Sequence, residues 1–274
     1  QYPLPKKMLT KMYERCDKIL VLEDGYPFVE EQLSSFFGLG KKITGRLDGT
    51  LQRDGELNPR KVATALGFEV PESPAIPELV KPRPPKLCAG CPHIYSYNAL
   101  NEALEAYSKG RVFSDIGCYT LGALEPFEAI NTCVDMGASI TMAKGAADAG
   151  FRPAIAVIGD STFTHSGMTG LLDAINDNTP ITVVILDNAT VAMTGGQTSS
   201  ATGKIEQICE ALGVEKEHII EVNPSPKFHE ENMEIFKKEI RYEGVSVIVP
   251  RRECLHTAAR RIREEKKKKE MQRV

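Results

Sequence analysis

Short apolar runs alternate with amphipathic stretches through the last two-thirds of the chain. Most of the apolar runs are five or six residues long and rich in Val and Ile, which is typical of strands buried on both faces of a parallel sheet. The stretches between them repeat apolar residues at helical spacing, so the predicted fold class is α/β with a doubly wound, mostly parallel sheet. The predicted strands are Ala154–Ile158, Ile181–Leu186, His218–Val222 and Val245–Val249. The predicted helices are Ser96–Tyr107, Ile140–Ala149, Met168–Asn176, Ile205–Leu212 and His229–Arg241.

A proline-rich stretch separates this pattern from the first part of the chain. Six prolines lie between residues 71 and 85, a density that disfavours both helix and central strand. The residues before it show a helix–strand–helix pattern at Leu9–Cys16, Lys18–Leu22 and Val29–Phe37. The sequence therefore predicts four parts: a small α/β domain at 1–70, short enough to suggest truncation, a linker at 71–86, a main domain at 87–258 and a charged helix at 259–274.

Charge and composition exclude several classes of protein. The formal net charge is −3 at pH 7, so no strong field favours nucleic acid or an anionic membrane. The longest apolar runs are far too short to cross a bilayer, and no secretory signal precedes them. The seven cysteines have no regular spacing, so we expect a reducing cytoplasm, where grouped cysteines bind metals more often than they form disulfides. The start at Gln1 suggests a cut fragment or a processed product.

The first chemical motif follows the strand Ala154–Ile158. Gly159-Asp160-Ser161-Thr162 stands at the carboxyl end of that strand, which is where open α/β sheets bind their ligands. Glycine lets the backbone approach a phosphate closely, and the hydroxyls and amides of the next residues can donate to it. Because a lone Gly-Asp at a strand end is commonly structural, the motif needs a second element nearby.

That second element follows the next strand. Ile181–Leu186 ends at Asp187-Asn188, and twenty-six residues separate Ser161 from Asn188, enough for one helix and one strand. Asn188 should therefore lie beside Asp160 at the same edge of the sheet. A carboxylate, an amide oxygen and a backbone carbonyl are hard oxygen ligands, which two phosphate oxygens and a water would complete around Mg²⁺. The pattern predicts a Mg²⁺–diphosphate site.

The spacing and the residues that follow it resemble a known signature. Gly-Asp-Ser, twenty-six residues and Asn188 resemble the thiamine diphosphate (ThDP) motif, in which Gly usually stands where this chain has Ser. The segment Asp187–Gln197, which ends in Thr-Gly-Gly-Gln, resembles the metal-binding loop of 2-oxoacid:ferredoxin oxidoreductases. By this resemblance Asp160 and Asn188 supply side-chain ligands to Mg²⁺, and Thr190 supplies its carbonyl.

Further segments strengthen the resemblance. They are Cys88–His93 (CAGCPH), Ser114–Gly122 (SDIGCYTLG), Asp135–Ile140 (DMGASI) and Gly159–Met168 (GDSTFTHSGM). Together they resemble the ThDP-binding region of the large (α) subunit of indolepyruvate ferredoxin oxidoreductases, which implies a ThDP-binding fold of the diphosphate-binding type. Leu20–Leu33 resembles the transketolase C-terminal-like domain that precedes this region in the family.

The resemblance also implies which residues contact the cofactor. They are Gly117, Cys118, Tyr119, Gly137, Ala138, Ser139, Gly159, Asp160, Ser161, Thr162, Asn188, Thr190 and Thr194. His93 and His165 lie inside matching segments and are candidates for contact with the diphosphate or the substrate, although a histidine near a helix start is as often structural. In this superfamily the glutamate that activates the cofactor belongs to a separate pyrimidine-binding domain, so we expect it outside this chain.

The cysteines leave two interpretations open. Cys88 and Cys91 form a C-x-x-C pair with no second pair, which weakens a structural zinc site. Related pyruvate and 2-oxoglutarate enzymes hold a [4Fe–4S] cluster with such a pair, a Cys after Gly and a Cys after a late strand, and Cys118 and Cys254 match the last two. Indolepyruvate enzymes usually carry clusters in a ferredoxin-like domain, so the alternative is that Cys91 and Cys118 only line the cofactor pocket. The other cysteines are expected in the core: Cys16, Cys133 and Cys209.

By resemblance, the chain is the ThDP- and Mg²⁺-binding part of an enzyme that converts an aryl pyruvate, CoA and oxidised ferredoxin into an acyl-CoA, CO₂ and reduced ferredoxin. It is not expected to be active alone, because a β subunit, an N-terminal pyrimidine-binding domain or both complete such sites, and we expect an oligomer. One alternative is a non-oxidative ThDP decarboxylase or synthase, which the C-x-x-C pair and Thr194–Gln197 disfavour. Another is a metal-clipped binding or assembly module with a vestigial cofactor site. Which 2-oxoacid is used stays open.

Overall fold

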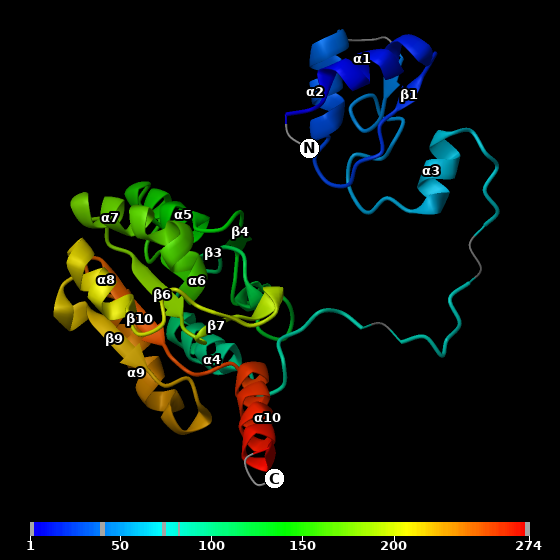
Figure 1. Ribbon diagram of the computed structural model, residues 1–274. Helices are drawn as coiled ribbons and strands as arrows, with labels where there is room; N and C mark the ends of the chain where they lie inside the picture. The colour runs from blue at the N-terminus through cyan, green and yellow to red at the C-terminus, as the bar shows by residue number, and fades with distance from the viewer. Residues whose placement is uncertain (1–2, 39–41, 73–74, 82, 272–274) are drawn as a thin grey trace. The chain divides into compact units, whose positions relative to one another are not determined.

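The structure of the chain is a computed structural model, which describes residues 3–38, 42–72, 75–81 and 83–271. It divides into two compact units, Gln1–Pro82 and Arg83–Val274 (Figure 1). Pro74 and Pro82 of the predicted linker, and the last three residues of the predicted charged helix, lie outside the described residues. Because each unit has its own core, the two are described separately.

The first unit is built around a small parallel sheet. Its elements are α1 (Lys6–Arg15), β1 (Ile19–Leu20), α2 (Phe28–Phe37), β2 (Ile43–Thr44) and α3 (Pro59–Ala65). β1 pairs with β2, and Ile19, Val21 and Leu33 form the buried cluster between sheet and helices. Both predicted helices are confirmed to within a few residues, whereas the predicted strand is shorter than expected and α3 was not predicted.

The second unit contains a six-stranded sheet in the order β4-β3-β5-β6-β10-β9. The strands are β3 (Val112–Ser114), β4 (Thr132–Cys133), β5 (Ile155–Gly159), β6 (Thr182–Leu186), β9 (Ile219–Val222) and β10 (Ser246–Pro250). All the pairings between these strands are parallel. The predicted α/β class and its four predicted strands are confirmed. β3 and β4 were not predicted, because strands of three and two residues are too short to show a hydrophobic periodicity.

Helices cover both faces of this sheet (Figure 1). One face carries α5 (Ala138–Asp148), α7 (Met168–Asn176) and α8 (Ile205–Leu212), and the other carries α4 (Pro92–Leu104) and α9 (His229–Ile240). β5 shows how the sequence specifies this arrangement, since alternate side chains point to opposite faces. Ala156 and Ile158 join the cluster of the first face, and Ile155 and Val157 join that of the second. A strand with two buried faces has to be apolar throughout, as β5 is.

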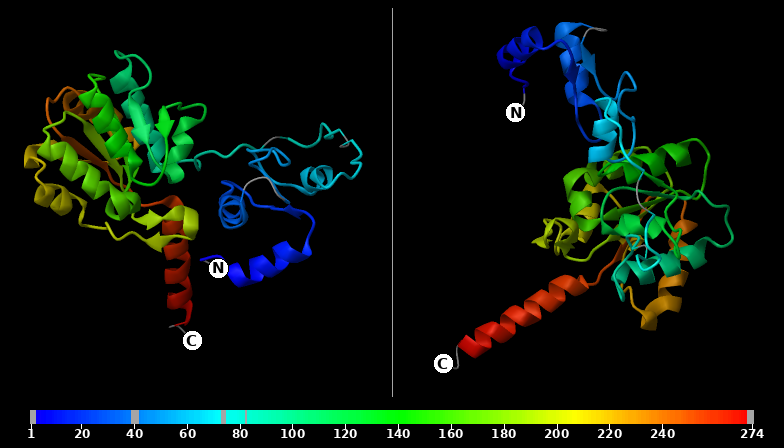
Figure 2. Two further views of the ribbon diagram at one scale, coloured as in Figure 1. Left: turned by 90° about the horizontal axis from the view of Figure 1, so that it is seen from above. Right: turned by 90° about the vertical axis from the view of Figure 1, so that its right-hand side faces the viewer.

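The second unit also contains several short elements and one longer helix. They are η1 (Cys118–Ala123), α6 (Asp160–Thr162), η2 (Phe163–Gly167), β7 (Thr190–Val191), η3 (Ala192–Thr194), β8 (Gln197–Thr198), η4 (Lys216–His218), η5 (Pro226–Phe228) and α10 (Leu255–Met271). The charged helix α10 projects away from the sheet (Figure 2) and buries none of its side chains. Every helix in the described part of the chain is too short or too polar to span a bilayer.

Candidate cofactor and metal site

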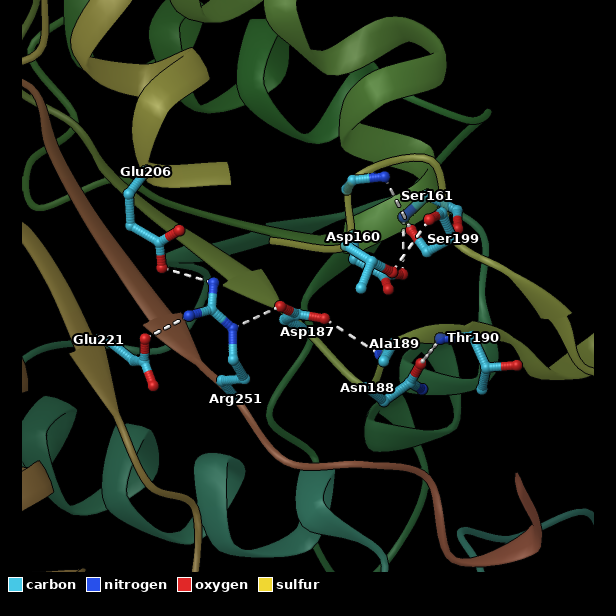
Figure 3. Close-up of polar contacts among 12 residues, drawn as sticks. Asp160, Ser161, Asp187, Asn188, Ala189, Thr190, Ser199, Glu206, Glu221 and Arg251 are labelled. Carbon is cyan, nitrogen blue, oxygen red and sulfur yellow. Dashed lines mark hydrogen bonds and ion pairs between the residues drawn. The ribbon is translucent and has the colours of Figure 1, made fainter. Parts of the chain in front are cut away.

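Charged residues follow four neighbouring strands at one edge of the sheet. Asp115 comes directly after β3, Asp160 after β5, Asp187 after β6 and Arg251 after β10. Because all these strands are parallel, their carboxyl ends meet at the same edge, which is the ligand-binding edge of open α/β sheets. Figure 3 shows the last three residues with the loop that follows β6.

Asp160 begins a continuous helical segment made of α6, η2 and α7. Its side chain is buried, with an exposed fraction of 4% for the residue. Oδ1 accepts a hydrogen bond from the Ser161 amide at 2.6 Å, while Oδ2 has no partner. The pKa of Asp160 is raised from 3.8 to about 6, mainly by burial and to a smaller extent by the nearby Asp187 carboxylate, while Ser161 and Ser199 act in the opposite direction. Ser199, which the sequence did not single out, lies beside Asp160 in Figure 3.

Two buried polar atoms at this helix start lack a hydrogen-bond partner, Asp160 Oδ2 and the Ser161 hydroxyl oxygen. In native proteins such atoms are uncommon, and each needs a physical explanation. A carboxylate oxygen without a donor suits a cation, and a free hydroxyl beside a helix start suits a phosphate oxygen. The pair therefore fits the Mg²⁺–diphosphate group predicted from the sequence.

Asn188 lies beside Asp160, as the strand spacing predicted, and its amide is fixed by two contacts. Its Oδ1 accepts from the Thr190 amide at 3.1 Å, and its Nδ2 lies 3.3 Å from His93 Nε2. Since the amide NH₂ must donate, His93 Nε2 accepts and the imidazole carries its proton on Nδ1. Burial lowers the pKa of His93 to about 4, which keeps the ring neutral. His93 thus contacts the predicted metal ligand.

The turn after β6 depends on Asp187. Its Oδ1 accepts from the Ala189 amide at 3.0 Å, and Ala189 has a positive φ of 60°, which is unfavourable for residues with a side chain. Asp side chains often stabilise such turns by accepting from the backbone two residues ahead. Asp187 therefore shapes the loop that presents Asn188 and Thr190.

A pocket of about 200 Å³ opens between these loops. Ten of the thirteen predicted cofactor-binding residues line it: Gly117, Cys118, Tyr119, Gly159, Asp160, Ser161, Thr162, Asn188, Thr190 and Thr194. The other three, Gly137, Ala138 and Ser139, do not line it, and Met136 is the residue of that segment that does.

Asp115 connects two walls of the pocket. It accepts hydrogen bonds from the Tyr119 hydroxyl, from the Gly137 amide at 3.2 Å and from the Ser139 hydroxyl at 2.7 Å. Burial raises the pKa of Asp115, while these donors lower it. The Tyr119 ring packs against the backbone of Gly159, where an added Cβ would lie 2.5 Å from the ring. Glycine is therefore required at the start of the motif for close packing.

Two hydroxyls predicted at the cofactor contact other side chains of the protein, and one predicted histidine lies away from the pocket. The Thr162 hydroxyl contacts the Tyr119 hydroxyl at 3.3 Å. The exposed Thr194 hydroxyl donates to Gln197 Oε1 at 2.7 Å. His165 is exposed, contacts the Ser166 hydroxyl at 3.0 Å and does not line the pocket. Neither candidate histidine lines this pocket, but His93 contacts Asn188, which does.

The four predicted cluster cysteines surround a second, smaller pocket of about 70 Å³: Cys88, Cys91, Cys118 and Cys254. Cys118, Asn188 and Ala192 line both this pocket and the larger one, so the two share a wall. In the described part of the chain, no group of three or more His, Cys, Asp or Glu side chains is placed to hold a metal ion. The pocket lined by these four cysteines, the cysteine pocket, thus offers no site for a single metal ion within the described residues.

One expectation about a cysteine needs correction, and one histidine without a predicted role lies at the cysteine pocket. Cys133, expected in the core, is exposed, because β4 is an edge strand of two residues with neither face covered. His256 was given no site role in the prediction, yet its Nε2 lies 3.2 Å from the Cys88 sulfur and it lines the cysteine pocket. Cys209 is buried as expected, and Cys16 packs against the core of the first unit.

Residues 115–249 match the family described as thiamine pyrophosphate enzyme, C-terminal TPP binding domain. The chain carries a ThDP-binding domain of this family. The segment matched includes Asp115, Asp160 and Asn188, and it ends within β10. Thiamine pyrophosphate and thiamine diphosphate are the same compound, so the cofactor class predicted from the motif is confirmed at the level of the domain.

The chain is also similar to longer proteins over most of its length. Indolepyruvate oxidoreductase subunit IorA of Archaeoglobus fulgidus is 33% identical over 285 residues, which cover 95% of this chain and 45% of the relative. The subunit of the same name from Pyrococcus abyssi is 34% identical over 292 residues, which cover 92% of this chain and 44% of the relative. The predicted resemblance to the large subunit of this family is confirmed. The chain spans a little under half the length of these relatives.

A solved structure shares the fold of the ThDP-binding domain. It is a 2-oxoglutarate:ferredoxin oxidoreductase from Magnetococcus marinus, with a TM-score of 0.50 and 18% identity. The match covers 64% of this chain and 66% of that one. At this level of identity the likeness concerns the fold, which agrees with the doubly wound sheet described above.

Proposed function

We propose that this chain supplies the Mg²⁺- and diphosphate-binding half of a ThDP site in a 2-oxoacid:ferredoxin oxidoreductase of the indolepyruvate type. The observation that carries the proposal is the pair of buried, unpartnered atoms, Asp160 Oδ2 and the Ser161 hydroxyl, beside Asn188 at the ends of β5 and β6. The names of the IorA relatives indicate the substrate class, an aryl pyruvate.

In this proposal each residue at the pocket has a separate task. Asp160, Asn188 and the Thr190 carbonyl would ligate Mg²⁺, which prefers an octahedron of oxygens that includes phosphate oxygens. The backbone at Gly159, the Ser161 hydroxyl and the Thr162 amide would hold the diphosphate at the start of the helical segment, where N–H groups without a helical acceptor favour anions. When bound, ThDP supplies the carbanion chemistry and the electron sink for decarboxylation of a 2-oxoacid.

The activating glutamate is expected from another domain or subunit. The pocket wall in the described part of the chain contains no glutamate. Apolar side chains at the pocket are exposed to water, with exposed fractions of 40% for Ile116, 42% for Met136 and 66% for Met193. Exposed apolar groups around a polar centre commonly mark a surface that another protein segment covers. A β subunit, an N-terminal pyrimidine-binding domain or both would fill this role.

We further propose that Cys88, Cys91, Cys118 and Cys254 hold a [4Fe–4S] cluster that accepts electrons from the cofactor. All four line one pocket, and Cys118 also lines the cofactor pocket, so the transfer distance would be short. Burial raises the pKa of Cys91 to about 11 without a metal, and cluster iron would supply the positive charge that stabilises its thiolate. Iron and sulfide analysis after anaerobic reconstitution tests this, with C133S as a matched control for C91S.

The complete reaction would convert an aryl pyruvate and CoA into an acyl-CoA and CO₂ and pass two electrons to ferredoxin. An acceptor for those electrons distinguishes this reaction from non-oxidative decarboxylation, and the cysteine pocket favours the oxidative form. Reduction of a viologen dye by the complete assembly with indolepyruvate and CoA would separate the two reactions.

The direct test is calorimetric titration with ThDP and Mg²⁺ under anaerobic conditions. We expect saturable, Mg²⁺-dependent binding that Asp160→Ala abolishes and Asp173→Ala leaves intact, because Asp173 is an exposed carboxylate on α7. Binding that does not need Mg²⁺, or that survives Asp160→Ala, would contradict the ligand assignment. Absence of binding in the intact protein together with its partners would refute the proposed function.

A further inference from the structure

Arg251, directly after β10, makes three ion pairs next to the segment Asp187–Gln197, which is called the metal loop below. Its three guanidinium nitrogens contact three carboxylates on three different elements: Nε contacts Asp187, Nη1 contacts Glu221 and Nη2 contacts Glu206 (Figure 3). Asp187 follows β6, Glu206 lies in α8 and Glu221 lies in β9. One side chain therefore joins the ends of the central strands to the helix that covers them.

The contact with Asp187 is the one that bears on the metal. Arg251 Nε donates to Asp187 Oδ2 at 2.7 Å, while Asp187 Oδ1 accepts from the Ala189 amide. Both carboxylate oxygens of Asp187 thus have hydrogen-bond donors, and the carboxylate points toward Arg251. Asp160 is close enough for the Asp187 charge to raise its pKa. Asp187 is next to Asn188 in the sequence, yet it is held in a position where it shapes the turn instead of ligating a cation.

Backbone contacts extend the same connection. The Arg252 amide donates to the Asp187 carbonyl at 3.0 Å, and the Cys254 amide donates to the Asn188 carbonyl at 3.1 Å. Further along, the Arg260 guanidinium donates to the Gly195 carbonyl at 3.0 Å. The segment that follows β10 therefore holds the metal loop near both of its ends.

We propose that Arg251 is a positioning residue for the Mg²⁺ site, which acts by fixing Asp187 and through it the turn that presents Asn188 and Thr190. This inference rests on the proposed function. Without the guanidinium, a buried carboxylate with an exposed fraction of 3% would lose its cationic partner beside Asp160. Buried charges without a partner are strongly unfavourable, so the turn would rearrange to expose or re-pair Asp187.

The test uses Arg251→Gln in the intact protein with its partners, with the apparent Mg²⁺ affinity measured by titration at saturating ThDP. We expect that affinity to fall on the order of tenfold, the usual effect of residues that orient metal ligands. Binding should recover at high Mg²⁺, because the ligands themselves remain. The matched control is Arg261→Gln, an arginine of the same segment whose partners, Glu253 and Glu265, do not touch the loop.

Asp187→Asn provides a second route if Arg251→Gln does not fold. This variant keeps the acceptor for the Ala189 amide and removes the charge of Asp187, so it should also lower the Mg²⁺ affinity. The double variant should bind Mg²⁺ no more weakly than whichever single variant has the lower affinity, because both changes break the same contact. R251K should recover only part of the affinity, since an ammonium cannot bridge three carboxylates with fixed geometry.

The outcomes separate this inference from the proposed function. If wild type shows no Mg²⁺-dependent ThDP binding, both fall. If wild type binds and Arg251→Gln binds Mg²⁺ equally well, the positioning role alone is refuted. Tighter Mg²⁺ binding by the variant would also refute it, because a released Asp187 would then be acting as an additional ligand.

Discussion

Replacing Asp160 by Asn should stabilise the metal-free protein at neutral pH while removing its capacity to bind Mg²⁺. The pKa of Asp160 is raised from 3.8 to about 6, mainly by burial. Keeping such a carboxyl ionised in the folded protein at pH 7 costs about 3 kcal/mol relative to the unfolded chain. The amide would leave an unpartnered NH₂ where Oδ2 now lies, which costs about 1–2 kcal/mol. We therefore expect D160N to raise the free energy of unfolding by about 1–2 kcal/mol.

The pH dependence of this effect follows from the direction of the pKa shift. Since the folded-state pKa lies above the unfolded value, ionisation favours the unfolded chain. The penalty is absent below about pH 4, grows as the pH rises toward 6 and is complete above that, where wild type is least stable relative to D160N. Taking the difference between the two proteins cancels the titration of all other groups.

The assay is urea denaturation in EDTA, followed by circular dichroism, for wild type, D160N and a D173N control at several pH values. The control changes an exposed carboxylate on the same helical segment and should leave stability unchanged within about 0.5 kcal/mol. A D160N protein that is less stable than wild type at pH 7 would refute the reasoning. So would a difference between them that does not change with pH.

Three other predictions address the packing and the thiols. Gly159→Ala places a Cβ 2.5 Å from the Tyr119 ring and should cost about 1–3 kcal/mol in urea denaturation, whereas an unchanged midpoint would contradict this close packing. In reduced, metal-free protein at about pH 8, iodoacetamide should alkylate the exposed Cys88 before Cys91, because the pKa of Cys91 is raised to about 11. Mass spectrometry of the peptides measures the order, and faster alkylation of Cys91 would contradict the prediction. Phe236→Ala, which removes a ring with an exposed fraction of 0% between α9 and the sheet, should cost about 3–5 kcal/mol by the same denaturation assay.

The central strands of the sheet could be predicted from the sequence because they are apolar at nearly every position. β5, β6 and β10 are buried on both faces, so each is an apolar run whose ends are visible in the sequence. β3 could not be predicted in the same way, since it contains three residues and its pairing with β5 depends on the tertiary fold. The motif that follows it, from Asp115 to Tyr119, was located by resemblance instead.

The candidate site also has a part that the sequence predicts and a part that it does not. Asp160 and Asn188 could be placed together from the sequence because they follow adjacent parallel strands, and the spacing of one helix and one strand fixes their order. The contacts that hold them could not be predicted. Arg251 contacts Asp187 across 64 residues, and His93 contacts Asn188 across 95, and no periodicity links positions so far apart. The first contact depends on the strand order, which places β10 beside β6, and the second depends on the packing of α4 near the end of β6.

The two aspartates at the ends of β5 and β6 differ in the partner that each one has. Asp187 is neutralised within the chain by Arg251, whereas Asp160 keeps one oxygen without any partner. A cation at Asp160 would remove the unfavourable burial of its charge, and a ligand that binds only the folded state at 100 times its dissociation constant adds about 2.7 kcal/mol to stability. The order of stability of wild type and D160N should therefore reverse when Mg²⁺ and ThDP are added. A reversal of this kind would show that the charge is destabilising by itself and is retained for its ligand.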